Sequence, residues 1–241
     1  MLKKINWFDV FLVLVIFALF GLFVFAQTRA KQRTVDEIKV EFLSNNNHFI
    51  TQEMVNNLLI QNFPNASNVF KDELDLNKLE EELQKNEMIA SSQVYFDENG
   101  VLKAEVVQKT AIARVLTENG SYYVDKQGEK MPLSDHFSAH VPVIYGKISD
   151  RNHQEFVRML NVIFEDDFLK KSITGIKINP DQSLSLTVRE YDYNVEFGRL
   201  AEVDKKFENY KAFLHHSKND TIVPYYKNVN LRFTEQVICT K

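Results

Sequence analysis

The 241-residue sequence has little cysteine, glycine or proline: one cysteine, Cys239, seven glycines and five prolines. A single cysteine cannot form an intramolecular disulfide or a thiolate-rich metal site, so neither can stabilise this fold. The few glycines leave little room for a Gly-rich phosphate-binding loop, and no such motif occurs. The stability of the folded domains must therefore come from ordinary packing of apolar side chains.

The sequence also lacks a strong charge of one sign. Its formal net charge is −4 and its pI is about 5.9, and no run of Lys and Arg with interleaved aromatic residues occurs. Nucleic-acid binding needs such a basic surface to neutralise phosphates, so we expect no nucleic-acid partner.

Signals for catalysis or metal binding are weak. Ser134, Asp135 and His136 are triad residue types, but neighbours in a chain cannot generally align as nucleophile, base and orienting group. His136 and His140 have ligand spacing without a flanking Glu on a helix, and the acidic run 165–167 lacks the spacing of a calcium loop. We therefore expect no enzyme activity, no metal, no other cofactor and no small-molecule substrate.

One long apolar run stands near the N-terminus. Val10–Ala26 contains no charged or polar side chain, and as a helix it would extend about 25 Å, close to the thickness of a bilayer core. We predict a transmembrane helix over residues 10–26, preceded by a cytoplasmic tail at 1–9 and followed by a linker at 27–35.

The orientation of this segment does not follow from its flanking charges. Lys3 and Lys4 precede the run, and Arg29, Lys31 and Arg33 follow it, so the positive-inside rule is close to neutral. The short tail favours a cytoplasmic N-terminus. A cleaved signal peptide remains an alternative, although the apolar run exceeds the usual 7–15 residues.

Residues 36–108 show the order strand, helix, helix, strand, strand. Alternation predicts the strands, helical spacing predicts the helices, and Asn99-Gly100 predicts a hairpin turn. The expected elements are Ile38–Leu43, Thr51 to about Gln61, Asp75–Lys85, Ile89–Phe96 and Val101–Gln108. Both helices can cover one face of a three-stranded sheet, giving a small α+β domain that looks like a POTRA domain.

From residue 109 to 241 the pattern changes to strands with tight turns and two longer helices. Pro142 predicts that Val141–Gly146 is a loop or an edge strand. The remaining expected elements are strands at Ala111–Thr117, Ser121–Val124, Ile173–Ile178, Leu184–Glu190, Asn194–Phe197, Val229–Phe233 and Gln236–Cys239, and helices at Asn152–Phe164 and Val203–His215. We expect a second antiparallel α+β domain whose last strand lies at a sheet edge, where it can accept a partner.

The order of these parts resembles the FtsQ/DivIB family of bacterial cell-division proteins. Tyr122–Gly128 is similar to the aromatic-rich turn of that family, which ends in Asp-x-x-Gly. Val141–Gly146 looks like its Leu-Pro-x-x-x-Gly segment, and Val229–Phe233 is similar to its terminal Asp-Leu-Arg-Tyr strand. The resemblance covers nearly the whole chain.

The resemblance implies a non-enzymatic, single-pass protein of the inner (cytoplasmic) membrane, with its C-terminal domains in the periplasm at the division septum. It implies recruitment of FtsB/FtsL (DivIC)-type bitopic coiled-coil partners by strand addition. Transferred to this sequence, the binding residues are Val229, Leu231, Arg232, Phe233, Val237 and Ile238. Two alternatives remain: a POTRA-bearing component of protein transport or outer-membrane assembly, and a membrane-anchored extracytoplasmic hydrolase.

Overall fold

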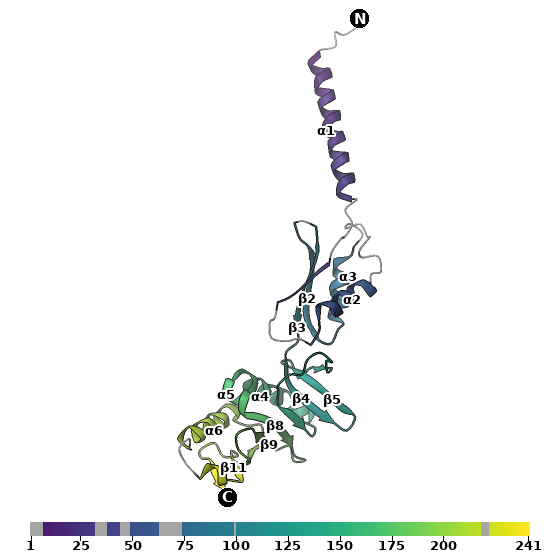
Figure 1. Ribbon diagram of the computed structural model, residues 1–241. Coiled ribbons are helices and arrows are strands. Elements are labelled where there is room, and N and C mark those ends of the chain that lie inside the picture. The colour runs from purple at the N-terminus through teal and green to yellow at the C-terminus, as the bar shows by residue number, and fades with distance from the viewer. Residues whose placement is uncertain (1–6, 32–37, 44–48, 63–73, 99, 218–221) are drawn as a thin grey trace. The chain divides into compact units, whose positions relative to one another are not determined.

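A computed structural model describes residues 7–31, 38–43, 49–62, 74–98, 100–217 and 222–241. The chain divides into two compact units. One contains residues 1–45 and 51–107, and the other contains 46–50 and 108–241. Each unit is α+β, as the sequence predicts (Figure 1).

The first helix, α1 (Trp7–Lys31), includes the long apolar run. Its described side chains between 11 and 25 are exposed. Among the described residues, no helix is long and apolar enough to cross a membrane. The predicted transmembrane helix over 10–26 is therefore wrong.

The segments predicted on either side of that run are only partly described. Residues 1–6 of the predicted tail and 32–35 of the predicted linker lie outside the described residues. Residues 27–31 of the predicted linker are helical, since α1 continues to Lys31.

The first unit contains a three-stranded sheet with the order β1 (Ile38–Phe42), β3 (Leu102–Gln108), β2 (Ile89–Phe96). Strands β1 and β3 are parallel, with Val40 opposite Ala104. Helices α2 (Gln52–Asn62) and α3 (Leu76–Gln84) pack beside each other against this sheet (Figure 1). These five elements confirm the predicted order.

Local signals explain where these elements begin. The Asp75 carboxylate accepts a hydrogen bond from the Lys78 N–H at 3.3 Å and so caps α3, and Thr51 Oγ1 accepts from the Met54 N–H at 3.2 Å at the start of α2. At the β2–β3 turn, Gly100 has φ +84°, which suits glycine, while Asn99 lies outside the described residues.

The second unit is built on a nine-stranded sheet with the order β12-β11-β10-β9-β8-β7-β4-β5-β6. The strands are β4 (Ala111–Thr117), β5 (Gly120–Asp125), β6 (Lys130–Met131), β7 (Val143–Tyr145), β8 (Ile173–Ile178), β9 (Leu184–Val188), β10 (Asn194–Gly198), β11 (Asn228–Asn230) and β12 (Ile238–Thr240). The pairs β4–β7, β7–β8 and β10–β11 are parallel and the others antiparallel, so the sheet is mixed and the prediction of an antiparallel sheet is wrong. The prediction that the last strand lies at an edge is confirmed.

The expectation for Val141–Gly146 is wrong, because β7 lies in the middle of the sheet between β4 and β8. Pro142 precedes the strand, so its missing N–H removes no hydrogen bond within it, and its carbonyl accepts from the Arg114 N–H at 3.0 Å. Ile144 is buried opposite Val115 and Ile176, in register with both neighbours.

Three helices pack on one face of this sheet: α4 (His153–Glu165), α5 (Asp167–Ser172) and α6 (Val203–Ser217). Two 3-10 turns, η2 (Asp150–Asn152) and η3 (Val223–Tyr225), precede α4 and β11. The buried side chains of the three α-helices, including Phe156, Leu160 and Phe207, form one core with the inward residues of the strands. Side chains such as Lys177 and Thr187 remain exposed on the other face.

Helix α5 is an element that the sequence did not reveal. The carboxylate of Asp166, which belongs to the acidic run 165–167, caps α5 by accepting from the N–H groups of Phe168 at 3.0 Å and Leu169 at 2.9 Å. Burial would raise the pKa of Asp166, but the hydrogen bonds from Lys211 and from these backbone N–H groups outweigh it and hold the pKa below its usual value.

Candidate partner-binding surface

The C-terminal strand β12 forms one edge of the nine-stranded sheet. It pairs antiparallel with β11, which places Asn230 opposite Ile238 and Val229 opposite Cys239. None of the described strands pairs with the other side of β12. Its outward backbone N–H and C=O groups are therefore available to another strand.

Two of the six predicted binding residues are core residues. Val229 and Leu231 are both 0 % exposed and belong to the hydrophobic core of the second unit. Val237 is half-buried and packs against the same core, as does Cys239, where burial raises the pKa of the thiol. These side chains hold β11 and β12 onto the molecule and cannot reach a partner without leaving the core.

The other three predicted residues lie at the surface. Phe233 is 51 % exposed, Ile238 is 38 % exposed, and Arg232 is exposed beside them in sequence. The structure thus places two large apolar side chains at the surface near the open edge, one within β12 and one between β11 and β12.

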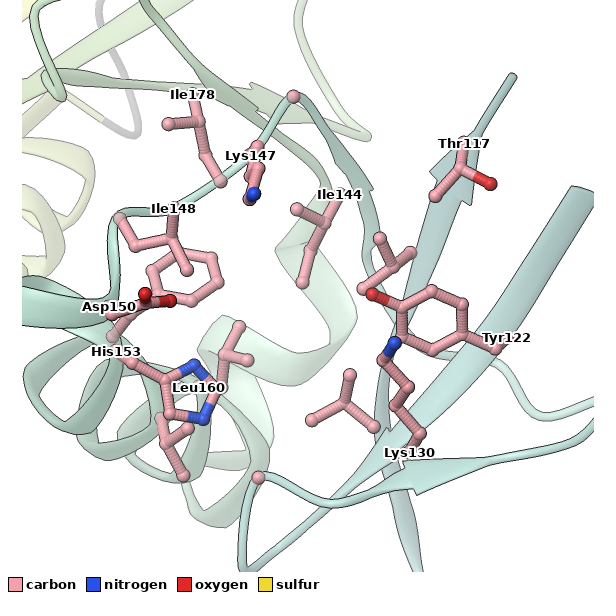
Figure 2. Close-up of a pocket in the computed structure, with 16 residues that line it drawn as sticks. Thr117, Tyr122, Lys130, Ile144, Lys147, Ile148, Asp150, His153, Leu160 and Ile178 are labelled. Atoms are coloured by element: carbon pink, nitrogen blue, oxygen red, sulfur yellow. The ribbon is translucent and has the colours of Figure 1, made fainter. Parts of the chain in front are cut away.

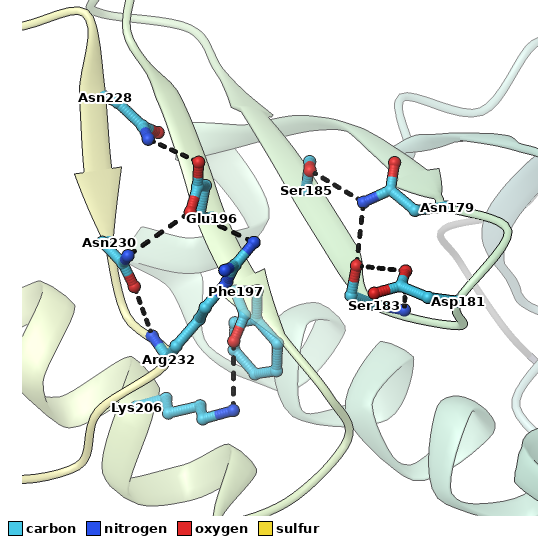
Figure 3. Close-up of polar contacts among 10 residues, drawn as sticks. All are labelled: Asn179, Asp181, Ser183, Ser185, Glu196, Phe197, Lys206, Asn228, Asn230 and Arg232. Atoms are coloured by element: carbon cyan, nitrogen blue, oxygen red, sulfur yellow. Dashed lines mark hydrogen bonds and ion pairs between the residues drawn. The ribbon is translucent and has the colours of Figure 1, made fainter.

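A polar cluster lies on the outer face of the same strands. Glu196 on β10 accepts from Asn228 Nδ2 at 2.6 Å and from Asn230 Nδ2 at 3.3 Å, and its Oε2 lies 3.3 Å from Arg232 Nη2 (Figure 3). Arg232 also donates its backbone N–H to Asn230 Oδ1 at 2.9 Å. The cluster ties β11 to β10 side by side and fixes where the chain leaves β11.

Gly198 allows the Arg232 side chain to cross the end of β10. Its φ is +78°, and a Cβ there would lie 2.9 Å from Arg232 Cγ. Any other residue would be strained in this conformation and would push Arg232 away. The turn after β11 therefore depends on glycine at this position.

Helix α6 contacts the segment between β11 and β12 through two polar side chains. Asn209 Nδ2 donates to the Thr234 carbonyl at 2.9 Å, and Lys205 Nζ lies 2.6 Å from Glu235 Oε1. The hydrogen bond between Lys205 and Glu235 raises the pKa of Lys205 and lowers that of Glu235. One neutral and one charge-assisted contact thus hold this segment close to α6.

Lys206 of α6 is buried and forms hydrogen bonds with the backbone at the end of β10. Its ammonium donates to the carbonyls of Phe197 at 3.0 Å and Arg199 at 2.8 Å (Figure 3 shows the first), and lies 4.7 Å from the centre of the Phe197 ring. Burial lowers its pKa. This role of Lys206 is not predictable from the sequence, because charged residues on amphipathic helices usually face water.

The residues that the sequence offered as catalytic candidates do not assemble into a site. Ser134 Oγ donates to the Phe49 carbonyl at 2.5 Å and accepts from the backbone N–H of His136 at 3.1 Å, so it is used in a turn. Within the described part of the chain, no group of three His, Cys, Asp or Glu residues is placed to hold a metal ion.

Glu196 and Ile238 illustrate which residues of this candidate surface can be predicted from sequence. Ile238 was predicted, but Glu196 was missed because it is 42 residues from Ile238 and joins the cluster only through the parallel pairing of β10 and β11. The one available signal was its place between inward-facing Val195 and Phe197, which predicts an outward carboxylate.

Comparison with protein families gives two matches, one mainly in each unit. Residues 37–107 match the POTRA-like domain, and residues 110–240 match the family described as FtsQ/DivIB, C-terminal related. A comparison with curated proteins found no match. Because the second match spans more than half of the chain, the protein belongs to the FtsQ/DivIB C-terminal related family, with a POTRA-like domain preceding the family region.

Proposed function

We propose that the protein is a non-enzymatic scaffold of the cell-division machinery that acts at the division septum. In this proposal the open edge of β12 recruits an FtsB/FtsL (DivIC)-type coiled-coil protein by strand addition. Membership of the FtsQ/DivIB C-terminal related family is consistent with a division role. The observation that carries the mode of binding is the unpaired edge of β12.

The composition of β12 supports strand addition. Ile238-Cys239-Thr240 contains no charge and no proline, and Ile and Thr are β-branched residues that favour strands. Backbone hydrogen bonds supply affinity in this mode, while alternate side chains supply specificity. Ile238 is the exposed apolar side chain on the strand, and Phe233 is a second apolar contact near its start.

The experiment that tests the proposal is a pull-down of the coiled-coil partner by the full chain carrying Phe233→Asp. The matched control is Tyr145→Asp, because Tyr145 is an aromatic residue of similar exposure, 48 % against 51 %, on the central strand β7. We expect Phe233→Asp to reduce recovery of the partner at least about tenfold, and Tyr145→Asp to leave it unchanged.

Equal recovery of the partner by both variants would contradict this binding surface. Depletion of the protein in cells tests the division role separately, since filamentous cells are expected and cells of normal length would contradict it. Because the two readouts are independent, a wrong surface can be distinguished from a wrong function.

A further inference from the structure

The end of the sheet opposite to β12 contains a pocket of about 390 Å³ between α4 and strands β4, β5 and β7. Its floor is apolar and consists of Val115, Ile144, Ile148, Phe156, Leu160 and Ile178. This volume lies within the range of pockets that hold small ligands or single peptide side chains.

Polar side chains stand around this apolar floor on two facing walls. Lys147, Asp150 and His153 come from the segment between β7 and α4 and from the start of that helix, while Tyr122 and Lys130 come from β5 and β6 (Figure 2). All except the half-buried Tyr122 are exposed. The pocket is thus amphipathic, with charged side chains at its mouth and apolar side chains at its floor.

The charged groups at the mouth are not neutralised by neighbours. Among the described residues, Lys147 Nζ, the Asp150 carboxylate and the His153 ring form no hydrogen bond or ion pair, and the ammonium of Lys130 lies over the Tyr122 ring, 5.0 Å from its centre. Two lysines and one aspartate give the mouth a positive balance before His153 is counted.

Both glycines that end the motifs singled out in the sequence lie in the wall of this pocket. A Cβ at Gly128 would lie 2.6 Å from Val157 Cγ2, and a Cβ at Gly146 would lie 2.7 Å from the Ile178 carbonyl oxygen. Their φ angles are +84° and +98°. Two separate segments therefore require glycine at the places where the wall is formed.

We propose that this pocket is a second binding site, for an acidic peptide segment of a partner protein. An apolar side chain of the peptide enters the floor, and carboxylates on either side of it pair with Lys130 and Lys147. Charge complementarity identifies this occupant: a small hydrophilic anion would leave the apolar floor in contact with water, whereas a basic peptide would meet like charges.

The site is independent of the edge of β12, because β12 and β6 are the two ends of the sheet. One scaffold molecule can then hold two partners at once, a strand at β12 and an acidic peptide at the pocket. Binding at two sites raises the effective concentration of each partner for the other.

The test uses the full chain labelled with ¹⁵N and two tripeptides as probes, acetyl-Glu-Phe-Glu-amide and acetyl-Lys-Phe-Lys-amide. Each is added to about 5 mM, which fills most of a site with a Kd near 1 mM. We expect the acidic peptide to shift the amide resonances of Gly128 and Gly146 in a saturable way. The basic peptide should not shift them.

A charge reversal makes the test specific. Lys130→Glu combined with Lys147→Glu should weaken the acidic peptide at least about tenfold and allow the basic peptide to bind. The control combines Lys171→Glu with Lys177→Glu, which changes net charge equally at exposed positions outside the pocket, and it should bind like the native chain. All four side chains are exposed, so folding should be unaffected.

Three results would overturn the proposal. The first is no saturable shift of Gly128 and Gly146 with the acidic peptide. The second is equal shifts with both peptides, and the third is equal weakening by the pocket and control variants.

Discussion

The two edges of the nine-stranded sheet differ in how they present their backbone. At one edge, β6 has two residues, Lys130 and Met131, and is followed at once by Pro132. A short strand, a lysine and a proline are devices by which natural sheets prevent another strand from pairing. At the other edge, β12 has three residues, contains neither lysine nor proline, and is followed by Lys241.

This difference supports the proposed division of roles along one sheet. The edge of β6 is protected from strand addition, and the end of the sheet beside it offers a pocket for side chains instead. The edge of β12 leaves its backbone open, and the buried side chains of Val229 and Leu231 keep it in place.

Leu231→Ala should destabilise the second unit by about 2–5 kcal/mol, because it removes a fully buried side chain and leaves a cavity. Ile238→Ala should cost much less, since Ile238 is 38 % exposed. Chemical denaturation monitored by circular dichroism measures both. Equal losses would contradict the assignment of Leu231 to the core and Ile238 to the surface.

Ile238→Lys gives β12 the protective lysine that β6 already has. We expect it to weaken the coiled-coil partner at least about tenfold, or about 1.4 kcal/mol, by isothermal titration calorimetry. Leu133→Lys is the matched control, because Leu133 is 39 % exposed and follows β6. A loss of affinity with Leu133→Lys and not with Ile238→Lys would contradict binding of the partner at β12 and indicate binding near β6.

Asp166→Ala provides a reference point in the helices, away from both edges. It removes the cap of α5 and should destabilise the second unit by about 0.5–2 kcal/mol near pH 7, without weakening the partner. The folded-state pKa of Asp166 lies below its ordinary value of 3.8, so its contribution is present above that pH and is lost as the pH falls below it.

The variant should therefore lose less stability than the native chain when the pH is lowered from about 5 to about 2. Thermal unfolding at a series of pH values measures this difference. If the stability of the two chains fell in parallel as the pH was lowered, Asp166 would not be the source of this pH dependence.

The smallest effect is expected for Lys205→Ala. Its ion pair with Glu235 is exposed, and exposed pairs are screened by water and salt. We expect no measurable change in the unfolding midpoint and no change in partner affinity. A clear loss of affinity would show that α6 positions the segment before β12 through this pair rather than through Asn209.

Local sequence patterns predicted most elements of both units. Alternation and helical spacing gave β1, α2, α3, β2 and β3 in order, because their signals lie within a few residues of each other. The central position of β7 and the existence of α5 could not be found in this way. Each depends on contacts distant in sequence, such as Ile144 with Ile176 and Asp166 with Lys211.

The binding surface was predicted as residues close together in sequence. In the structure some of these side chains face the core and others face solvent. Alternation along the chain sends Val229 and Leu231 inward, so a contiguous segment cannot be a contiguous surface. The apolar run at 10–26 was the strongest sequence signal, yet no helix among the described residues is long and apolar enough to cross a membrane.

Hydrogen–deuterium exchange of the full chain, with and without the coiled-coil partner, tests the central claim most directly. Strand addition at β12 predicts slower exchange of the amides of residues 238–240 in the complex, with exchange at 130 and 131 unchanged. Protection at β6 with none at β12, in a complex that has formed, would contradict the account.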